Sequence, residues 1–366
     1  MRATNSGNLK REGMIRNSAE IIITENGDAV LYKVSDNSKF MTSNIFAARI
    51  MEYAPQLHSY FVDIGDARRA LLNAPEETYR SGDFCIAQIA AAARGHKGAR
   101  VTTRIRLTGV FVVLLYGEPA HSINISAKIK DGAERERLAM IGESLHADCS
   151  LILRTEAAGA SAAAIAADVS KLSAVWHSIT RRYREASADA APGLLFAENP
   201  MIGVLLKYPL ESYTELCADT PEMIDTLRRE FPQAAERIRY YPKRIFAVKS
   251  VDTVKTTLLG KRVYLKSGAD LVIEKTEALT VIDVNTGKSS ASYEAVNFEA
   301  AREIMRQLRL RDIGGIIVCD FIEMDDPKDR AALVSYMREL AARDPSKPEI
   351  PGLTALGLME IARRRS

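Results

Sequence analysis

Two short apolar runs, joined by a helical pattern, mark the last third of the chain. The runs 278–282 and 315–319 are continuous and brief, as buried strands are. Between them, apolar side chains recur at helical spacing over 293–311, which predicts a helix. Gly314 and Gly315 are expected to end it with a left-handed cap. This strand–helix–strand order predicts two neighbouring parallel strands.

Polar side chains follow each of these predicted strands. Asp283 closes the first, with Asn285 two residues later, and Asp320 closes the second. The carboxyl ends of parallel strands meet at one sheet edge, which is where open α/β sheets bind ligands. Two carboxylates and an amide there suit Mg²⁺, with Mn²⁺ as an alternative. Acids after strands also cap turns, so spacing alone supports the metal site and simple capping equally.

The first third of the chain reads as short strands. Residues 19–32 predict a hairpin turned at Asn26-Gly27. Four or five strands between 43 and 107 predict a small barrel of OB type. Aromatic Tyr60 and Phe61 among cations would suit single-stranded nucleic acid, and the alternative is a solvated surface with Phe61 in the barrel core. The cations in question are Arg68, Arg69, Arg94, His96, Lys97, Arg100, Arg104 and Arg106.

Strands alternate with helices beyond the predicted barrel. Strands at 110–115 and 150–155 flank a helix at 131–145, and a long helix follows over 161–185. The second strand ends at Arg154 and Thr155, a guanidinium fork beside a hydroxyl, which suits a terminal phosphate. In the alternative reading, Arg154 forms an ion pair with Glu156. A further hairpin is expected over 261–274.

Composition limits the possible classes of protein. The 366 residues are enough for two or more domains, and 47% are hydrophobic. A net charge of +3 means that nucleic-acid binding must rest on local clusters. No apolar run is long enough to span a membrane, and residues 1–10 resemble a disordered tail rather than a signal peptide. The scattered histidines give no zinc constellation, and free thiols in the cytoplasm are expected from Cys85, Cys149, Cys217 and Cys319.

Several of these segments together resemble the ribonuclease E/G family. The most specific block starts with KTEALTVIDVNTG at 275–287 and continues through NFEAA at 297–301. It ends with RQLRLRDIGG at 306–315 and DFIEM at 320–324. The resemblance covers the chain from about residue 21 to residue 365, through the shorter matches at 61–65, 94–98, 101–103, 153–155 and 356–360.

This resemblance implies a fold and an activity. The family cleaves single-stranded RNA by Mg²⁺-dependent hydrolysis, leaving 3′-hydroxyl and 5′-phosphate ends, during processing and decay of mRNA or rRNA precursors. Its fold is α/β and multidomain: an RNase H-like domain holds an inserted OB-type RNA-binding barrel and a 5′-sensor, beside a DNase I-like catalytic domain. Carried over, the parts are 1–36 (tail and first RNase H-like part), 37–107 (barrel), 108–191 (5′-sensor), 192–258 (second RNase H-like part) and 259–366 (DNase I-like domain).

The resemblance also implies roles for single residues. Asp283 and Asp320 match the metal-binding catalytic carboxylates, and Asn285 the amide that orients them or contacts the scissile phosphate. Arg154 and Thr155 match a pocket that prefers a 5′-monophosphate. The backbone near Gly109 and Val113 belongs to the same pocket, and the barrel residues matched to RNA contact are Phe61 and Lys97.

The chain departs from the family pattern at several places. The family's Cys-Pro-x-Cys zinc link between protomers has no counterpart here, so we expect no zinc and a monomer or weak oligomer. Leu71 replaces a barrel aromatic, and Ala355 replaces a basic residue. Weakened grip of RNA leaves open a non-catalytic RNA-binding or scaffold protein. A DNA nuclease stays a weaker alternative, because the sequence does not show what would contact a 2′-hydroxyl.

Overall fold

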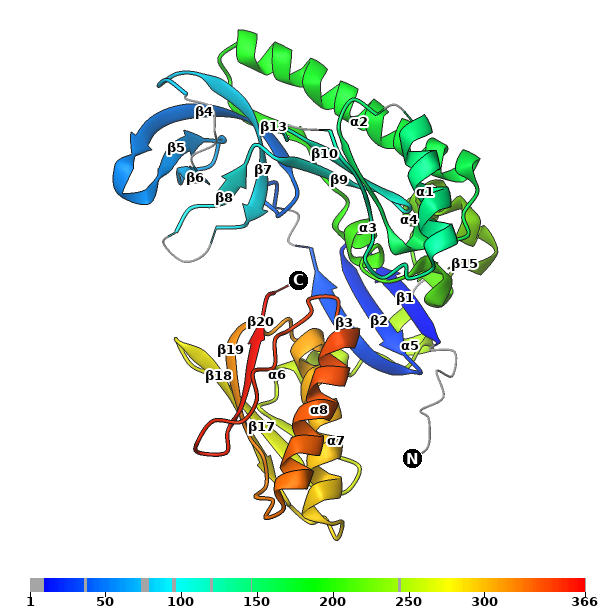
Figure 1. Cartoon of the computed structure of the whole chain (residues 1–366), viewed down its shortest axis with the longest axis vertical. Coiled ribbons are helices and arrows are strands. Elements are labelled where there is room, and N and C mark those ends of the chain that lie inside the picture. Colours follow the sequence, from blue (N-terminus) through cyan, green and yellow to red (C-terminus); the bar gives the residue numbers. More distant parts are fainter. Residues whose placement is uncertain are drawn as a thin grey trace. The chain divides into compact units, whose positions relative to one another are not determined.

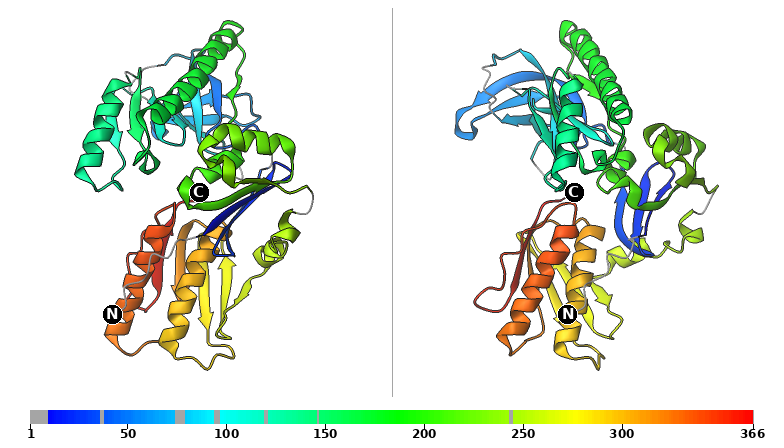
Figure 2. Two further views of the ribbon diagram at one scale, coloured as in Figure 1. Left: turned by 90° about the vertical axis from the view of Figure 1, so that its right-hand side faces the viewer. Right: turned by 45° about the vertical axis from the view of Figure 1, so that its right-hand side comes forward.

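A computed structural model of the chain describes residues 10–35, 38–73, 79–93, 97–118, 121–145, 147–242 and 245–365. It divides into two compact units, one formed by 1–34 with 211–366 and the other by 35–210. Both contain sheets and helices (Figures 1 and 2), so the predicted mixed α/β class is confirmed. Within the described residues, no helix has the length and apolar character needed to cross a bilayer. The division into five parts stays a prediction.

The first sheet of the first unit combines strands from two distant parts of the sequence. Its order is β15-β14-β1-β2-β3, and β1 pairs with β14 in parallel. The β2–β3 turn holds Asn26 and Gly27 at φ 52° and 89°, so the predicted hairpin is confirmed. The strands are β1 (Arg11–Arg16), β2 (Glu20–Glu25), β3 (Asp28–Val34), β14 (Tyr213–Ala218) and β15 (Ile238–Tyr240), accompanied by α4 (Pro221–Glu230), α5 (Ile245–Val248) and α6 (Val254–Leu259).

The second sheet of this unit carries the predicted strand-end acids. Its order is β16 (Arg262–Tyr264), β17 (Asp270–Lys275), β18 (Leu279–Asn285), β19 (Gly315–Asp320) and β20 (Met359–Arg363). β18 and β19 are parallel neighbours, as predicted. Helices α7 (Tyr293–Leu310) and α8 (Pro327–Arg343) lie side by side over one face of the sheet (Figure 1). Apolar side chains of both helices and of that face form the core of the sheet.

Helix α7 begins and ends by different means. The Ser292 side chain accepts a hydrogen bond from the Ala295 N–H at 3.2 Å, a standard N-cap. The residue in the left-handed conformation after the helix is Asp312, at φ 46°. The expected left-handed glycine cap is therefore wrong, because aspartate also tolerates this conformation. Gly315, at φ 105°, instead starts β19, and Gly314 is close-packed, since a Cβ there would lie 2.9 Å from the Arg363 carbonyl oxygen.

The second unit contains a closed five-stranded barrel. Neighbouring strands run β4-β5-β6-β8-β7, and β7 pairs back to β4. The predicted small barrel is thus confirmed, and β13 extends its wall beside β4. The strands are β4 (Ile45–Ala54), β5 (Ser59–Asp63), β6 (Ala70–Asn73), β7 (Phe84–Ala91), β8 (Arg100–Thr102) and β13 (Gly193–Phe196).

A four-stranded sheet completes the second unit. Its order is β11-β12-β10-β9, with α2 covering an apolar face that also includes barrel side chains from β4. Trp176 of α2 stacks on Tyr116 at 4.1 Å between ring centroids. The elements are β9 (Ile105–Thr108), β10 (Val112–Tyr116), β11 (Ile123–Ile125), β12 (Ser150–Leu153), α1 (Gly132–Ser144), α2 (Ala162–Ala188) and α3 (Pro200–Leu205).

Candidate active site

The two predicted carboxylates lie side by side on the face of the second sheet opposite α7 and α8, although β18 continues to Asn285, so that Asp283 lies two residues before the end of its strand. Asp283 is in direct register with Asp320 across the parallel β18–β19 pair. Neighbouring strands are about 4.8 Å apart, so the two side chains leave the sheet close together. Alternation along β18 sends Ile282 and Val284 into the core, and it therefore exposes Asp283 on the other face. The structure thus brings together the acids that the sequence pattern singled out.

Asn285 is held beside the first acid. Its Nδ2 donates to Oδ2 of Asp283 at 3.0 Å. Among the described residues, no cation forms an ion pair with Asp283 or Asp320. Two adjacent carboxylates without a counter-charge repel each other, and a divalent cation would relieve that repulsion. The oxygen donors suit Mg²⁺, and the described residues contain no group of three or more His, Cys, Asp or Glu side chains placed to enclose a metal.

A buried asparagine fixes the segment that follows Asp320. Asn297 of α7 is fully buried, and its Nδ2 donates to the Ile322 carbonyl oxygen at 2.7 Å. Its Oδ1 accepts from the Ile322 N–H at 3.0 Å. Both backbone groups of a residue two positions beyond Asp320 are therefore held by one side chain. Sequence reasoning did not single out this role, although Asn297 is a polar residue on the mostly apolar buried face of α7.

Strand β16 contributes further side chains to the face that carries the acids. Tyr264 pairs with Asp270, which pairs in turn with Asn285. Asp270 is buried, and its Oδ2 accepts from Nη1 of Arg262 at 2.8 Å. Sequence reasoning missed these residues, although the predicted hairpin over 261–274 contained the signal. Since Val263 enters the core, alternation places its two neighbours on the opposite face.

Arg154 lies at the end of β12 and is mostly buried. Its Nη2 donates to the Leu206 carbonyl oxygen at 2.6 Å, and its Nη1 to the carbonyl oxygen of Gly109. Its Nε lies 3.4 Å from Oε2 of Glu156, so the alternative ion pair is present. Burial lowers the pKa of Arg154, while the charges of Glu156 and Asp168 act against that shift. The guanidinium carries five N–H groups and therefore retains donors beyond these contacts.

The other predicted phosphate ligands lie around Arg154. The Thr155 hydroxyl is 3.0 Å from the Ser126 hydroxyl. Gly109 faces the Asp168 carboxylate so closely that a Cβ at this position would lie 2.4 Å from Oδ2. Asp168 accepts from the Phe111 and Val112 N–H groups at 2.7 and 3.2 Å, and burial raises its pKa.

Val113 differs from these residues. It is buried in the middle of β10 and pairs with strands on both sides. Its backbone is thus within a sheet rather than at an edge. The Asp168 carboxylate beside Gly109, by contrast, belongs to the surroundings of Arg154, and sequence reasoning did not anticipate it.

The predicted RNA contacts of the barrel are on its outside. Phe61 is half-buried and is not one of the described core residues, so its alternative placement in the barrel core is wrong. It pairs across β5–β6 with Leu71, which pairs with Arg100. Lys97 is exposed just before β8. Tyr60 by contrast is buried against Tyr53 and Tyr79, and Arg94 and His96 lie outside the described residues.

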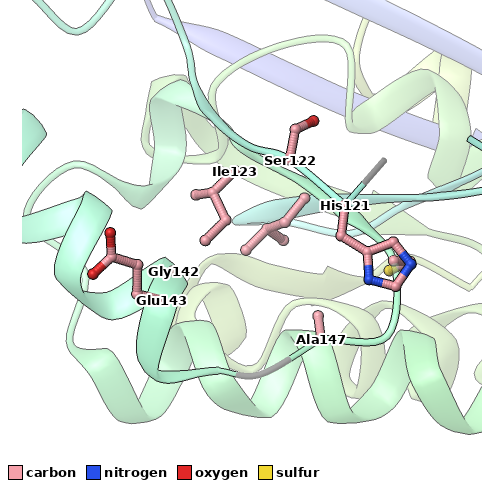
Figure 3. Close-up of a pocket in the computed structure, with 8 residues that line it drawn as sticks. His121, Ser122, Ile123, Gly142, Glu143 and Ala147 are labelled. Atoms are coloured by element: carbon pink, nitrogen blue, oxygen red, sulfur yellow. The ribbon is translucent and has the colours of Figure 1, made fainter. Parts of the chain in front are cut away.

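Two cavities among the described residues lie apart from these groups. One of about 110 Å³ lies between β11, α1 and β12, with His121, Ile123 and Glu143 in its lining (Figure 3). Another of about 170 Å³ is lined by residues that include Asp28, Thr257 and Arg306. Neither is lined by the strand-end acids or by Arg154.

The fold and the acid pair define a mixed α/β protein with a closed barrel and two carboxylates side by side on an exposed sheet face. The ribonuclease E/G family model matches residues 106–366, and the chain belongs to this family. Ribonuclease E of Escherichia coli (strain K12) is 31% identical, over 88% of this chain and 33% of the relative. Ribonuclease E of Buchnera aphidicola subsp. Acyrthosiphon pisum is also 31% identical, over 88% of this chain and 39% of the relative. Ribonuclease G of E. coli K12 is 30% identical, over 89% and 73%. The chain therefore spans well under half of these ribonuclease E relatives and nearly three quarters of the ribonuclease G relative.

Proposed function

We propose that this chain is a Mg²⁺-dependent endoribonuclease that hydrolyses single-stranded RNA in the cytoplasm. The observation that carries the proposal is the in-register pair Asp283 and Asp320, exposed and without a cationic partner among the described residues, in a member of the ribonuclease E/G family. The parts of the chain would follow the family plan. The sheet with the acids would be the DNase I-like catalytic domain, the β1–β3 sheet the RNase H-like domain, and the remainder the OB-type barrel and 5′-sensor.

The two acids, Asn285 and the barrel residues each have a separate role in this proposal. Bound Mg²⁺ would neutralise charge on the phosphodiester and make a water nucleophile available at neutral pH. Asp283 and Asp320 would hold the cation through their carboxylates. Asn285 would keep Asp283 in one rotamer through its 3.0 Å hydrogen bond and leave its own carbonyl oxygen for ligand or substrate. Phe61 and Lys97 on the barrel would hold RNA by stacking and by charge.

The direct test replaces each acid by its amide. We expect Asp283→Asn and Asp320→Asn to abolish cleavage of a labelled single-stranded RNA while changing its affinity less than threefold. Asp225→Asn, at an exposed position on α4, is the matched control and should cut normally. Normal cleavage by either acid variant, or by the unmodified chain in excess chelator, would refute the assignment. Binding without any cleavage by the unmodified chain would instead favour the non-catalytic RNA-binding alternative.

The preference for a 5′-monophosphate is the finer part of this proposal. Arg154 is supported by two backbone carbonyls, which orient its fork, and Thr155 lies next to it. The Glu156 carboxylate, 3.4 Å from Nε, would repel a phosphate bound at the remaining guanidinium donors. We therefore expect 5′-monophosphorylated RNA to be cut faster than its 5′-hydroxyl form, and Glu156→Gln to widen that ratio.

The variant that tests the 5′-end preference is Arg154→Lys, which keeps the charge but loses the two-pronged geometry. The ratio of the two rates should fall about tenfold, because a charge-assisted hydrogen bond contributes about 1.5–3 kcal/mol. The rate on 5′-hydroxyl RNA should stay unchanged. Equal rates on both RNAs in the unmodified chain would show that Arg154 is a structural ion-pair residue.

A further inference from the structure

Two residues of the edge strand β16 share the sheet face that carries the candidate active site. Arg262 lies in the cross-strand row that contains Asp283 and Asp320. Tyr264 lies in the next row, which contains Asn285. Cross-strand partners in an antiparallel sheet project from the same face, so Arg262 and Tyr264 of β16 extend the surface around the acids.

Tyr264 is unusual for an aromatic residue in a strand. Its side chain is 77% exposed. Among the described residues, its ring stacks on no other ring and its hydroxyl has no hydrogen-bond partner. A large exposed aromatic surface beside a polar site is typical of a binding position. Arg262 next to it is half exposed, and its Nη1 is held by the buried Asp270 carboxylate, which fixes the direction of the guanidinium.

We propose that Tyr264 and Arg262 form a nucleotide subsite for the RNA strand that is cleaved at Asp283 and Asp320. The Tyr264 ring would stack on a base, and the outward edge of Arg262 would contact a backbone phosphate. This inference rests on the proposed function and adds a base-binding position to it. Two strand spacings separate Tyr264 from Asn285, about 10 Å between their Cα atoms, so the stacked base belongs to a nucleotide near the scissile phosphate rather than to the reacting one.

Charge on the same face favours this path for the strand. The row below the acids ends in Glu274 on β17 and Glu360 on β20, with Val281 and Val318 between them. Lys261 lies 3.0 Å from the Glu274 carboxylate, so among the described residues Glu360 supplies the charge on that row that repels a polyanion. Arg262 is paired with Asp270 through Nη1 and keeps its other N–H groups for a phosphate. The exposed Lys288 belongs to the same end of the sheet, because its N–H donates to the Gly268 carbonyl oxygen at 2.9 Å, in the turn that follows β16.

The test measures binding separately from cleavage. A short fluorescent single-stranded RNA is titrated in chelator, where no cutting is expected, and a set of RNAs with one abasic nucleotide at successive positions is compared with it. We expect one abasic position to weaken binding by the unmodified chain. Loss of one base–aromatic stack typically weakens binding roughly five- to a hundredfold. Tyr264→Ala should weaken binding of the intact RNA by the same factor and become insensitive to the abasic site at that position.

Two variants separate stacking from a structural effect. Tyr264→Trp keeps a stacking ring and should retain both affinity and the abasic effect. Tyr240→Ala removes an exposed tyrosine from β15, in the other sheet of the same unit, and should change neither affinity nor the abasic effect. In cleavage assays, Tyr264→Ala should raise KM and leave kcat nearly unchanged, as expected for a group that binds ground state and transition state alike.

The outcomes distinguish this inference from the proposed function. If the chain cuts RNA but Tyr264→Ala keeps the full abasic profile, the subsite is overturned and the nuclease assignment stands. If the chain binds RNA without cutting it, the abasic comparison alone decides the subsite. If Tyr264→Ala changes the oligomeric state on sizing and leaves the abasic profile intact, the face is an interface between copies and the subsite is overturned. Absence of any RNA binding overturns it as well.

Discussion

Replacing Asn297 by alanine tests whether the position of Asp320 depends on a side chain that never touches the substrate. Asn297 is fully buried, and its amide makes two hydrogen bonds to the backbone of Ile322. In Asn297→Ala both Ile322 groups lose this partner. Among the described residues, this segment then keeps the packing of Phe321 and Met324 in the core and the Arg330 guanidinium, which donates to the Met324 carbonyl oxygen at 2.5 Å.

The size of the effect follows from these contacts. Leaving a buried donor or acceptor unpaired costs about 1–3 kcal/mol each. Ile322 is half-buried, so water reaches it in part and the lower end of that range applies. The free energy of unfolding of the first unit should therefore fall by about 2–3 kcal/mol. Outer-shell partners of metal ligands typically change metal affinity or activity about 10–100-fold, and we expect the Mg²⁺ concentration for half-maximal cleavage to rise by at least tenfold.

A second variant separates this local effect from a general loss of stability. Asp344 forms a buried ion pair with Arg363, with 2.8 Å between Nε and Oδ2. Arg363 is in register with Gly315, at the opposite end of β19 from Asp320. Asp344→Ala should destabilise the same unit by about 3–5 kcal/mol, because it leaves a buried guanidinium without its main partner. It should nevertheless keep the unmodified Mg²⁺ dependence.

The assay follows each unit by its own signal. The chain has one tryptophan, Trp176, which lies in the second unit, so its fluorescence in urea reports that unit alone. Far-UV circular dichroism reports both units. Cleavage is measured against Mg²⁺ at low temperature, where both variants remain folded. An Asn297→Ala protein with the same Mg²⁺ midpoint and rate as Asp344→Ala would refute the positioning role.

Three further predictions concern ion pairs, pH and thiols. Glu339→Ala breaks an exposed pair with Arg343 and should change stability by less than about 0.5 kcal/mol, far less than Asp344→Ala, when urea unfolding of the two variants is compared. Hydrogen bonds from Arg137 and the Gly159 N–H lower the pKa of Glu134 to about 2, so its stabilising contribution is present above the ordinary value near 4.5 and lost as pH falls towards 2. Trp176 fluorescence of Glu134→Gln should accordingly show a shallower loss of stability with acid than the unmodified chain; an identical acid profile would contradict this. Burial raises the pKa of three thiols, so we expect no labelling of the native chain by a thiol reagent at pH 8. After denaturation, four thiols should be labelled, at Cys85, Cys149, Cys217 and Cys319. Elemental analysis should find no stoichiometric zinc.

The sequence alone determined the pairing of the two acids and the Asn26-Gly27 turn. Two apolar runs followed by acids were enough to place Asp283 beside Asp320, because alternation within each strand is local and a single helix joining two strands favours a right-handed crossover between parallel neighbours. The Asn26-Gly27 hairpin was predictable for the same reason, since a two-residue turn with positive φ favours these residue types. In the hairpin over 261–274, strand alternation also predicts that Arg262 and Tyr264 lie on the same face. We recognised this only in the structure.

Tertiary structure decided what depends on residues far apart in the chain. β1 was not predicted, because its pairing with β14 joins residues about 200 positions apart and its short, charged ends give little local signal. The surroundings of Arg154 were equally hidden: Leu206 and Asp168 reach it from separate helical segments. Periodicity reports which face of an element is apolar, but the identity of a distant partner is set only when the chain closes around a shared core.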